Sequence, residues 1–112
     1  MKKYDFIVGI PCSKLNDFTD KIENYIPCTK EDEAVALAAG AYLAGKKPLV
    51  FLQNSGLGNI VDITTSLLKP YDIKVDLLIS VRNKPEHHAL MGKITKRLLK
   101  LLEYKSYRLV EK

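Results

Sequence analysis

The stretch Thr29–Glu33 (TKEDE) leads into Ala34–Gly45 (AVALAAGAYLAG), a run of small and apolar residues. The helix dipole favours acidic residues at a helix start, and Thr29 is a suitable N-cap with Asp32 as its capping-box partner. We therefore expect a helix whose small side chains let a neighbouring backbone approach closely. Glu31 stands where the preceding strand passes into this helix, so its carboxylate is placed to exchange a proton with a ring nitrogen.

A second stretch, Gln53–Asn59 (QNSGLGN), follows the apolar run Pro48–Gln53. Its two glycines let a ligand approach the backbone, and its side-chain amides offer hydrogen-bond donors and acceptors. The turn has neither the Lys-Ser/Thr of a phosphate-binding P-loop nor the spacing of the dinucleotide fingerprint. It indicates either a site for a heteroaromatic ring or a carboxylate, or a tight strand–helix turn that binds nothing.

Short apolar runs alternate with helical patterns along the whole chain. The expected strands are Tyr4–Ile10, Tyr25–Thr29, Pro48–Gln53, Val75–Val81 and a short edge strand Tyr107–Val110. The expected helices are Lys14–Glu23, Ala34–Gly45, Asn59–Leu68 and Ile94–Leu102, with a polar loop over Arg82–Gly92. This alternation predicts an α/β fold with a mainly parallel sheet flanked by helices.

The unusual polar groups of the chain follow the expected strands. They lie in Pro11–Ser13, Thr29–Glu31, Gln53–Gly58 and Arg82–His88. Because ligands of parallel α/β sheets bind outside the C-terminal ends of the strands, this placement predicts one site at that edge.

Each candidate residue also has a plainer interpretation. Glu31 is either the chemical centre of the site or an ordinary first-turn acid. Arg82 is either a clamp for an acidic substrate or a surface charge. His87 and His88 either transfer a proton and contact an anion or are exposed and idle. Cys12 is either a small buried residue or a ligand contact, whereas Cys28 is expected in the core.

Length and composition indicate one small globular domain. The chain has 112 residues, a net charge of +5 and two cysteines. The lysines are spread over expected helix surfaces and ends, which favours a solvated face over a nucleic-acid interface. No signal peptide, membrane-spanning run or metal-ligand spacing of cysteines is recognisable. We expect a reduced cytoplasmic protein that binds neither nucleic acid nor membrane.

Two motifs resemble those of thiamine-diphosphate enzymes. Glu31 stands nine positions before Gly40, as the glutamate does in the pyrimidine-binding domain of those enzymes. The turn Gln53–Asn59 is more specific and resembles the QNSGLGN turn of the sulfopyruvate and phosphonopyruvate decarboxylases. Further similarities lie in Ile10–Ser13, Leu78–Arg82 and Met91–Thr95, so the resemblance covers residues 6–104.

The resemblance implies a pyrimidine-binding domain and a set of site residues. Glu31 would hydrogen-bond to N1′ of the cofactor's aminopyrimidine and assist its activation for decarboxylation of a 2-oxo acid. By similarity, the residues that would line the cofactor or substrate are Gln53, Asn54, Ser55, Gly56 and Asn59. His88 matches a histidine of the phosphonopyruvate enzymes. Cys12, Ser13 and Arg82 are implied substrate contacts, and Cys12 stands where sulfopyruvate α subunits have a cysteine.

The chain departs from the family pattern in two ways. It lacks the Gly-Asp-Gly motif, followed later by Asn, that holds the diphosphate through Mg²⁺, and it lacks the helix that usually precedes the first strand. The resemblance therefore implies a single domain over residues 1–112, the α subunit of a hetero-oligomer, inactive without a diphosphate-binding β subunit.

The reaction implied is decarboxylation of sulfopyruvate to sulfoacetaldehyde and CO₂, a step of coenzyme M biosynthesis. The alternatives are a phosphonopyruvate decarboxylase subunit, a non-catalytic binding module of the same fold, and an unrelated α/β protein that binds an anion or nucleotide.

Overall fold

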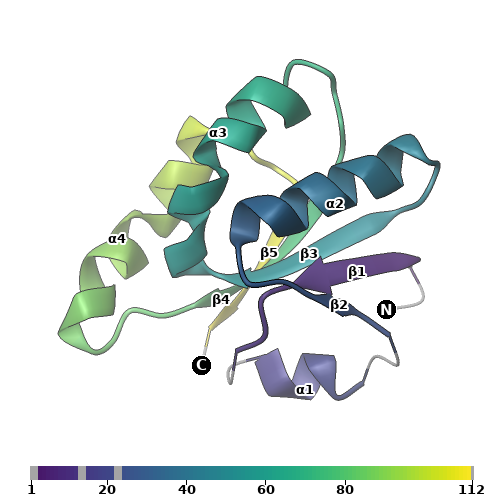
Figure 1. Ribbon diagram of the computed structural model, residues 1–112. Helices are drawn as coiled ribbons and strands as arrows, with labels where there is room; N and C mark the ends of the chain where they lie inside the picture. Colours follow the sequence, from purple (N-terminus) through teal and green to yellow (C-terminus); the bar gives the residue numbers. More distant parts are fainter. Residues whose placement is uncertain (1–2, 13–14, 22–23, 112) are drawn as a thin grey trace.

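The computed structural model describes residues 3–12, 15–21 and 24–111. Its strands form one sheet in the order β2-β1-β3-β4-β5, and every neighbouring pair is parallel (Figure 1). The strands are β1 (Phe6–Gly9), β2 (Ile26–Pro27), β3 (Pro48–Gln53), β4 (Asp76–Val81) and β5 (Tyr107–Glu111). The α-helices are α1 (Asn16–Thr19), α2 (Glu31–Leu43), α3 (Val61–Ile63) and α4 (Glu86–Leu101). The predicted α/β class is confirmed, and the edge strand β5 is parallel like the others.

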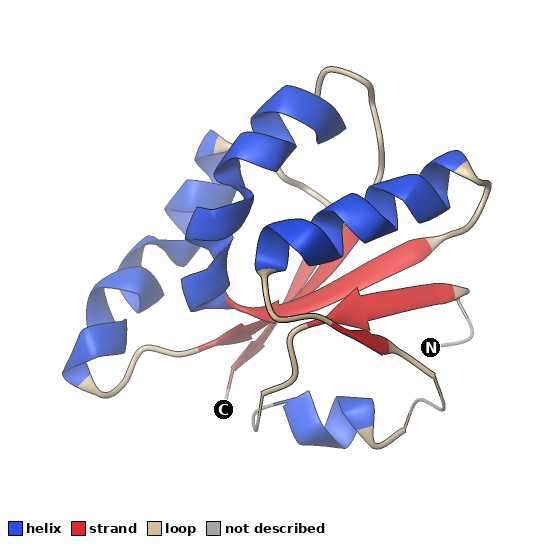
Figure 2. Ribbon diagram, viewed as in Figure 1, coloured by secondary structure: helices blue, strands red, loops and turns tan. Residues whose placement is uncertain are grey.

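The sheet has a helix layer on each face. Helices α2, α3 and α4 cover one face and α1 lies on the other (Figure 2). Alternate residues of β3 point to opposite faces, as the pleat requires. Val50 and Leu52 pack in the larger core with α2, whereas Leu49 and Phe51 pack in the smaller core with α1. Among the described residues, no helix has the length and apolar character needed to cross a membrane.

Helix α2 starts without the predicted cap. Its N-cap is Lys30, in extended conformation, and no side chain caps it, so the prediction of Thr29 as N-cap is wrong. Asp32 instead accepts a hydrogen bond at Oδ1 from the neighbouring Glu33 N–H at 2.9 Å. Thr29 is a bend between β2 and Lys30, so it lies one residue before the N-cap position. The predicted end of the helix is confirmed, since Gly45 has a φ of 90°, which suits glycine.

The polar loop predicted over Arg82–Gly92 is confirmed only as far as Pro85, and the rest of the prediction is wrong. Helix α4 begins at Glu86 and places His87 and His88 in its first turn. Pro85 is the N-cap of this helix, and Glu86 is an acidic first-turn residue of the kind that favours a helix start. The first turn carries no buried apolar stripe, however, so the helical period becomes visible only further along the sequence.

Other boundaries also differ from the prediction. Strands β1 and β2 are shorter than Tyr4–Ile10 and Tyr25–Thr29. The helix predicted over Lys14–Glu23 is one turn, α1, although its two predicted end residues lie outside the described residues. The segment predicted as Asn59–Leu68 starts earlier: Asn54–Ile60 is a 3₁₀ helix, α3 follows, and Thr64–Leu68 is a π-helix. Because the 3₁₀ helix begins directly after β3, the Gly-rich turn is itself helical.

We predict that Gly9→Ala destabilises the fold. A Cβ at Gly9 would stand 2.2 Å from the Phe51 carbonyl oxygen and 2.6 Å from its ring. That ring is held edge-on by Phe18 and Tyr25, at centroid distances of 5.7 and 5.2 Å. Overpacking of this kind costs about 1–3 kcal/mol, measured as a lower urea midpoint.

The matched control is Gly40→Ala in α2, where a Cβ would meet no atom within 4 Å. Alanine is the better helix former, so this variant should be as stable as wild type or gain up to about 1 kcal/mol. Equal unfolding midpoints for the two variants would contradict the packing argument.

Candidate active site

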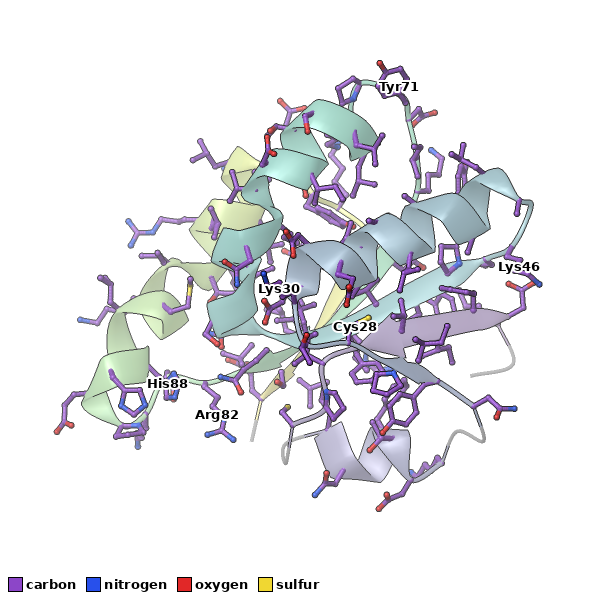
Figure 3. All side chains as sticks on the ribbon, viewed as in Figure 1. Cys28, Lys30, Lys46, Tyr71, Arg82 and His88 are labelled. Atoms are coloured by element: carbon purple, nitrogen blue, oxygen red, sulfur yellow. The ribbon has the colours of Figure 1, made fainter. Side chains whose placement is uncertain are left out.

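Residues predicted for the site gather at the C-terminal edge of the sheet. Lys30, Arg82 and His88 lie toward this end, whereas Lys46 and Tyr71 lie away from it (Figure 3). Lys30 immediately precedes α2 and Arg82 immediately follows β4. Parallel strands thus bring separate connections to one place, as the sequence pattern predicted.

Glu31 is joined to the Gly-rich turn by direct contact. It is the first residue of α2 and is partly buried. Its Oε1 accepts a hydrogen bond from Asn59 Nδ2 at 2.8 Å. A Cβ at Gly56 would lie 2.6 Å from Oε2, so the carboxylate occupies the space that any other residue at position 56 would fill. The structure therefore brings together Glu31, Gly56 and Asn59 and holds the carboxylate in a defined orientation.

Asn54 lies in the same turn but points into the protein. It is fully buried, and its Oδ1 accepts a hydrogen bond from the Arg82 N–H at 2.9 Å. Its Nδ2 donates to the Arg82 carbonyl and to Thr95 Oγ1, both at 3.0 Å. The polar atoms of this side chain are thus directed at protein groups.

The neighbours of Asn54 remain accessible at the turn. Gln53 Nε2 donates a hydrogen bond to Ser55 Oγ at 3.0 Å. Ser55 is exposed and Gln53 is partly buried. These two side chains can therefore turn to a ligand at the edge of the sheet, a role that stays a prediction.

Cys12 follows β1 on the face covered by α1. Its Sγ lies 3.3 Å from Oγ of Ser80, a fully buried serine of β4. Cys12 is partly exposed, so a ligand can reach it. The neighbouring Ser13, predicted as a substrate contact, lies outside the described residues. Ser80 is not among the candidates named from the sequence, although a hydroxyl within the apolar run Leu77–Val81 is a usable signal.

Arg82 and His88 are the basic residues predicted for the site. The pKa of His88 is lowered by desolvation and then by the positive charges of His87 and Arg82. The rings of His87 and His88 have centroids 4.1 Å apart. The lowered pKa favours the neutral imidazole of His88 near pH 7.

Cys28 belongs to the core, as predicted. Burial, followed by the negative charge of Glu33 and a hydrogen bond to it, raises the pKa of the Cys28 thiol. The thiol therefore stays protonated at neutral pH and is a poor nucleophile.

Comparison with known proteins gives several relatives. No protein-family model matches the chain. Sulfopyruvate decarboxylase subunit alpha from Methanocaldococcus jannaschii is 38% identical, over 93% of this chain and 67% of that protein. The subunit of the same name from Methanococcus maripaludis is 38% identical, over 88% of this chain and 65% of its own length. Phosphonopyruvate decarboxylase from Streptomyces viridochromogenes is 39% identical, over 87% of this chain and 27% of its own length.

The chain thus spans about two thirds of the alpha subunits that it matches and a smaller share of the phosphonopyruvate enzyme. The similarity extends over most of the chain and includes the segments that form the site edge. On this identity and coverage, the chain belongs to the family of sulfopyruvate and phosphonopyruvate decarboxylases.

Proposed function

We propose that this chain is the pyrimidine-binding α subunit of a thiamine-diphosphate-dependent sulfopyruvate decarboxylase. The observation that carries the proposal is the Glu31 carboxylate, fixed by Asn59 above Gly56 at the C-terminal edge of a parallel sheet. The reaction would convert sulfopyruvate to sulfoacetaldehyde and CO₂, a step of coenzyme M biosynthesis.

The residues around Glu31 fit the aminopyrimidine of thiamine diphosphate. Asn59 donates to Oε1, which leaves Oε2 above Gly56 as the oxygen that can hold or move a proton at N1′ of the ring. Gln53 and Ser55 would contact the ring or the substrate from the same turn. When bound, thiamine diphosphate supplies the carbon nucleophile and the electron sink for loss of CO₂.

Three residues would act on the substrate by binding it or transferring a proton: Arg82, His88 and Cys12. A 2-oxo acid that also carries a sulfonate is a dianion, and a guanidinium binds either anionic group well. Neutral His88 would accept or return a proton near the reacting carbon. Cys12 would contact the substrate where β1 ends, and the role of Ser13 rests on the family resemblance.

The names and lengths of the relatives favour sulfopyruvate over phosphonopyruvate as the substrate. The proteins named subunit alpha are matched over about two thirds of their length, and their name implies a separate partner chain. Phosphonopyruvate decarboxylase is the second candidate, because the Streptomyces protein is as similar in sequence.

A partner subunit would supply what this chain lacks. The Gly-Asp-Gly motif is absent from the sequence, so we propose that a β subunit binds the diphosphate and Mg²⁺. The outward face of α2 is a suitable surface for that subunit, because Leu37 and Leu43 are 42% and 71% exposed beside Ala36 and Gly40. The free thiols Cys12 and Cys28 are consistent with a reducing, cytoplasmic compartment.

We predict that Glu31→Gln lowers CO₂ release from sulfopyruvate by at least about 100-fold, because the amide cannot exchange the proton at N1′. The measurement uses this chain co-purified with a subunit that carries the Gly-Asp-Gly motif, with thiamine diphosphate and Mg²⁺ added. This chain alone should release no CO₂.

The matched control is Glu33→Gln, which alters an exposed acid of the same helical turn and should retain wild-type activity. Equal rates for Glu31→Gln and wild type would refute the role of Glu31. Turnover of phosphonopyruvate but not sulfopyruvate would favour the second candidate.

We predict that Gly56→Ala displaces the Glu31 carboxylate and lowers activity by about tenfold or more, since a small misplacement of a catalytic group is costly. Gly58→Ala is the comparison variant, because a Cβ there meets no atom within 4 Å. The ratio of the two activities, both measured on folded protein, isolates the clash with Glu31. A ratio near one would contradict the proposed arrangement.

We predict that His88 titrates below the ordinary histidine pKa of about 6.5, because desolvation and two neighbouring positive charges disfavour the imidazolium. Arg82→Gln removes one of those charges and should raise the pKa of His88. NMR titration of the histidine ring protons in this chain measures both values. If neutral His88 is required, activity should fall as the pH drops through its pKa. A His88 pKa that does not move in Arg82→Gln would contradict this arrangement.

A further inference from the structure

The carboxamide of Asn54 completes a pairing that the backbone does not make. Strands β3 and β4 pair up to Gln53 and Ser80, after which the chain turns from β3 into the 3₁₀ helix. The Asn54 side chain then accepts from the N–H of Arg82 and donates to its carbonyl. One side chain therefore satisfies both backbone groups of Arg82, as a strand residue would do.

The same carboxamide reaches helix α4. Asn54 Nδ2 donates to Thr95 Oγ1 at 3.0 Å, and Thr95 Oγ1 donates to the Met91 carbonyl at 2.6 Å. Thr95 is 2% exposed, so this contact is inside the protein. The Asn54 side chain thus ties the end of β3 to both the end of β4 and the buried face of α4.

Gly92 of α4 also packs closely against the connection between β4 and α4. A Cβ at Gly92 would lie 2.4 Å from Asn83 Cβ and 3.3 Å from the Arg82 carbonyl oxygen. The Arg82–Asn83 backbone is therefore confined between Asn54 and α4. His88, in the first turn of α4, depends on this contact for its place beside Arg82 (Figure 3).

We propose that Asn54 is a positioning residue that holds the Arg82 main chain and the start of α4, rather than a cofactor contact. Its carboxamide is fully buried, and both of its donor hydrogens are directed at protein acceptors. By fixing this connection, Asn54 sets where Arg82 and His88 stand at the site edge. The expected effect of Asn54 on substrate binding rests on the proposed function. The hydrogen bonds between Asn54 and the Arg82 main chain do not.

Hydrogen exchange in this chain tests directly whether Asn54 fixes the Arg82 main chain. Thr95→Val removes one acceptor of Asn54 with little change in shape, and spares Asn54 itself. The Arg82 amide should then exchange about tenfold faster relative to the Ile79 amide within β4, the size expected for one lost hydrogen bond. Thr95→Ser keeps the hydroxyl and should restore slow exchange. Thr65→Val, which removes an exposed hydroxyl in the π-helix Thr64–Leu68, is the matched control.

Kinetics with the partner subunit test the positioning role. Thr95→Val should raise the KM for sulfopyruvate at least about threefold and leave the half-saturating concentration of thiamine diphosphate unchanged. Asn54→Ser should act in the same direction. Combined with Arg82→Gln, it should raise KM by a smaller factor than it does in wild type, because residues that act partly through one group are non-additive.

Each other outcome has a distinct meaning. The positioning role would be refuted if the ratio of the Arg82 to the Ile79 exchange rate were unchanged in Thr95→Val. It would also be refuted if the Arg82 amide exchanged rapidly in wild type. A raised requirement for thiamine diphosphate in Asn54→Ser, with Thr95→Val kinetically normal, would make Asn54 a cofactor contact. If the wild-type complex decarboxylates neither acid, the proposed function fails, and the exchange ratio still decides whether Asn54 holds Arg82.

Discussion

Because all five strands are parallel, the residues that follow them are delivered to one edge of the sheet. Glu31 begins α2 and Asn59 belongs to the turn after β3, yet their side chains are hydrogen-bonded at 2.8 Å. Arg82 follows β4, and its main chain is bonded to the turn through Asn54. None of these contacts is local in sequence, so the site depends on the direction and register of the strands.

The sequence was most informative where burial is continuous. Strand β3 has the bounds predicted from its apolar run, because a parallel strand buried on both faces carries no polar interruption. It was least informative where a helix starts in solvent. The first turn of α4 is polar, so no hydrophobic period marked it, and α2 begins after an extended Lys30 without a side-chain cap. At both starts the exact first residue was therefore not fixed by the local pattern, which places helix boundaries only to within a few residues.

Asn54 and Asn59 show why residue type alone could not assign the site. Both are amides of the same turn, and the family resemblance implied cofactor contact for both. In a 3₁₀ helix five residues correspond to a rotation of about 600°, that is, about 240° beyond one full turn, so the two side chains leave on different sides. One is fully buried against Arg82 and Thr95, and the other reaches the Glu31 carboxylate. Only the packing of the turn against α4 separates their roles.

Helix α2 links the site to the proposed assembly. Ala34, Val35 and Ala38 are buried on its inner face, while Leu37 and Leu43 on its outer face are 42% and 71% exposed. A helix that is apolar on all sides is normally covered on all sides. Burying both leucines against a partner would contribute on the order of 2–4 kcal/mol to association. Since Glu31 is the first residue of this helix, a subunit that covers the outer face would also adjoin the carboxylate. The placement of the Glu31 carboxylate and the attachment of the proposed partner would then depend on the same helix.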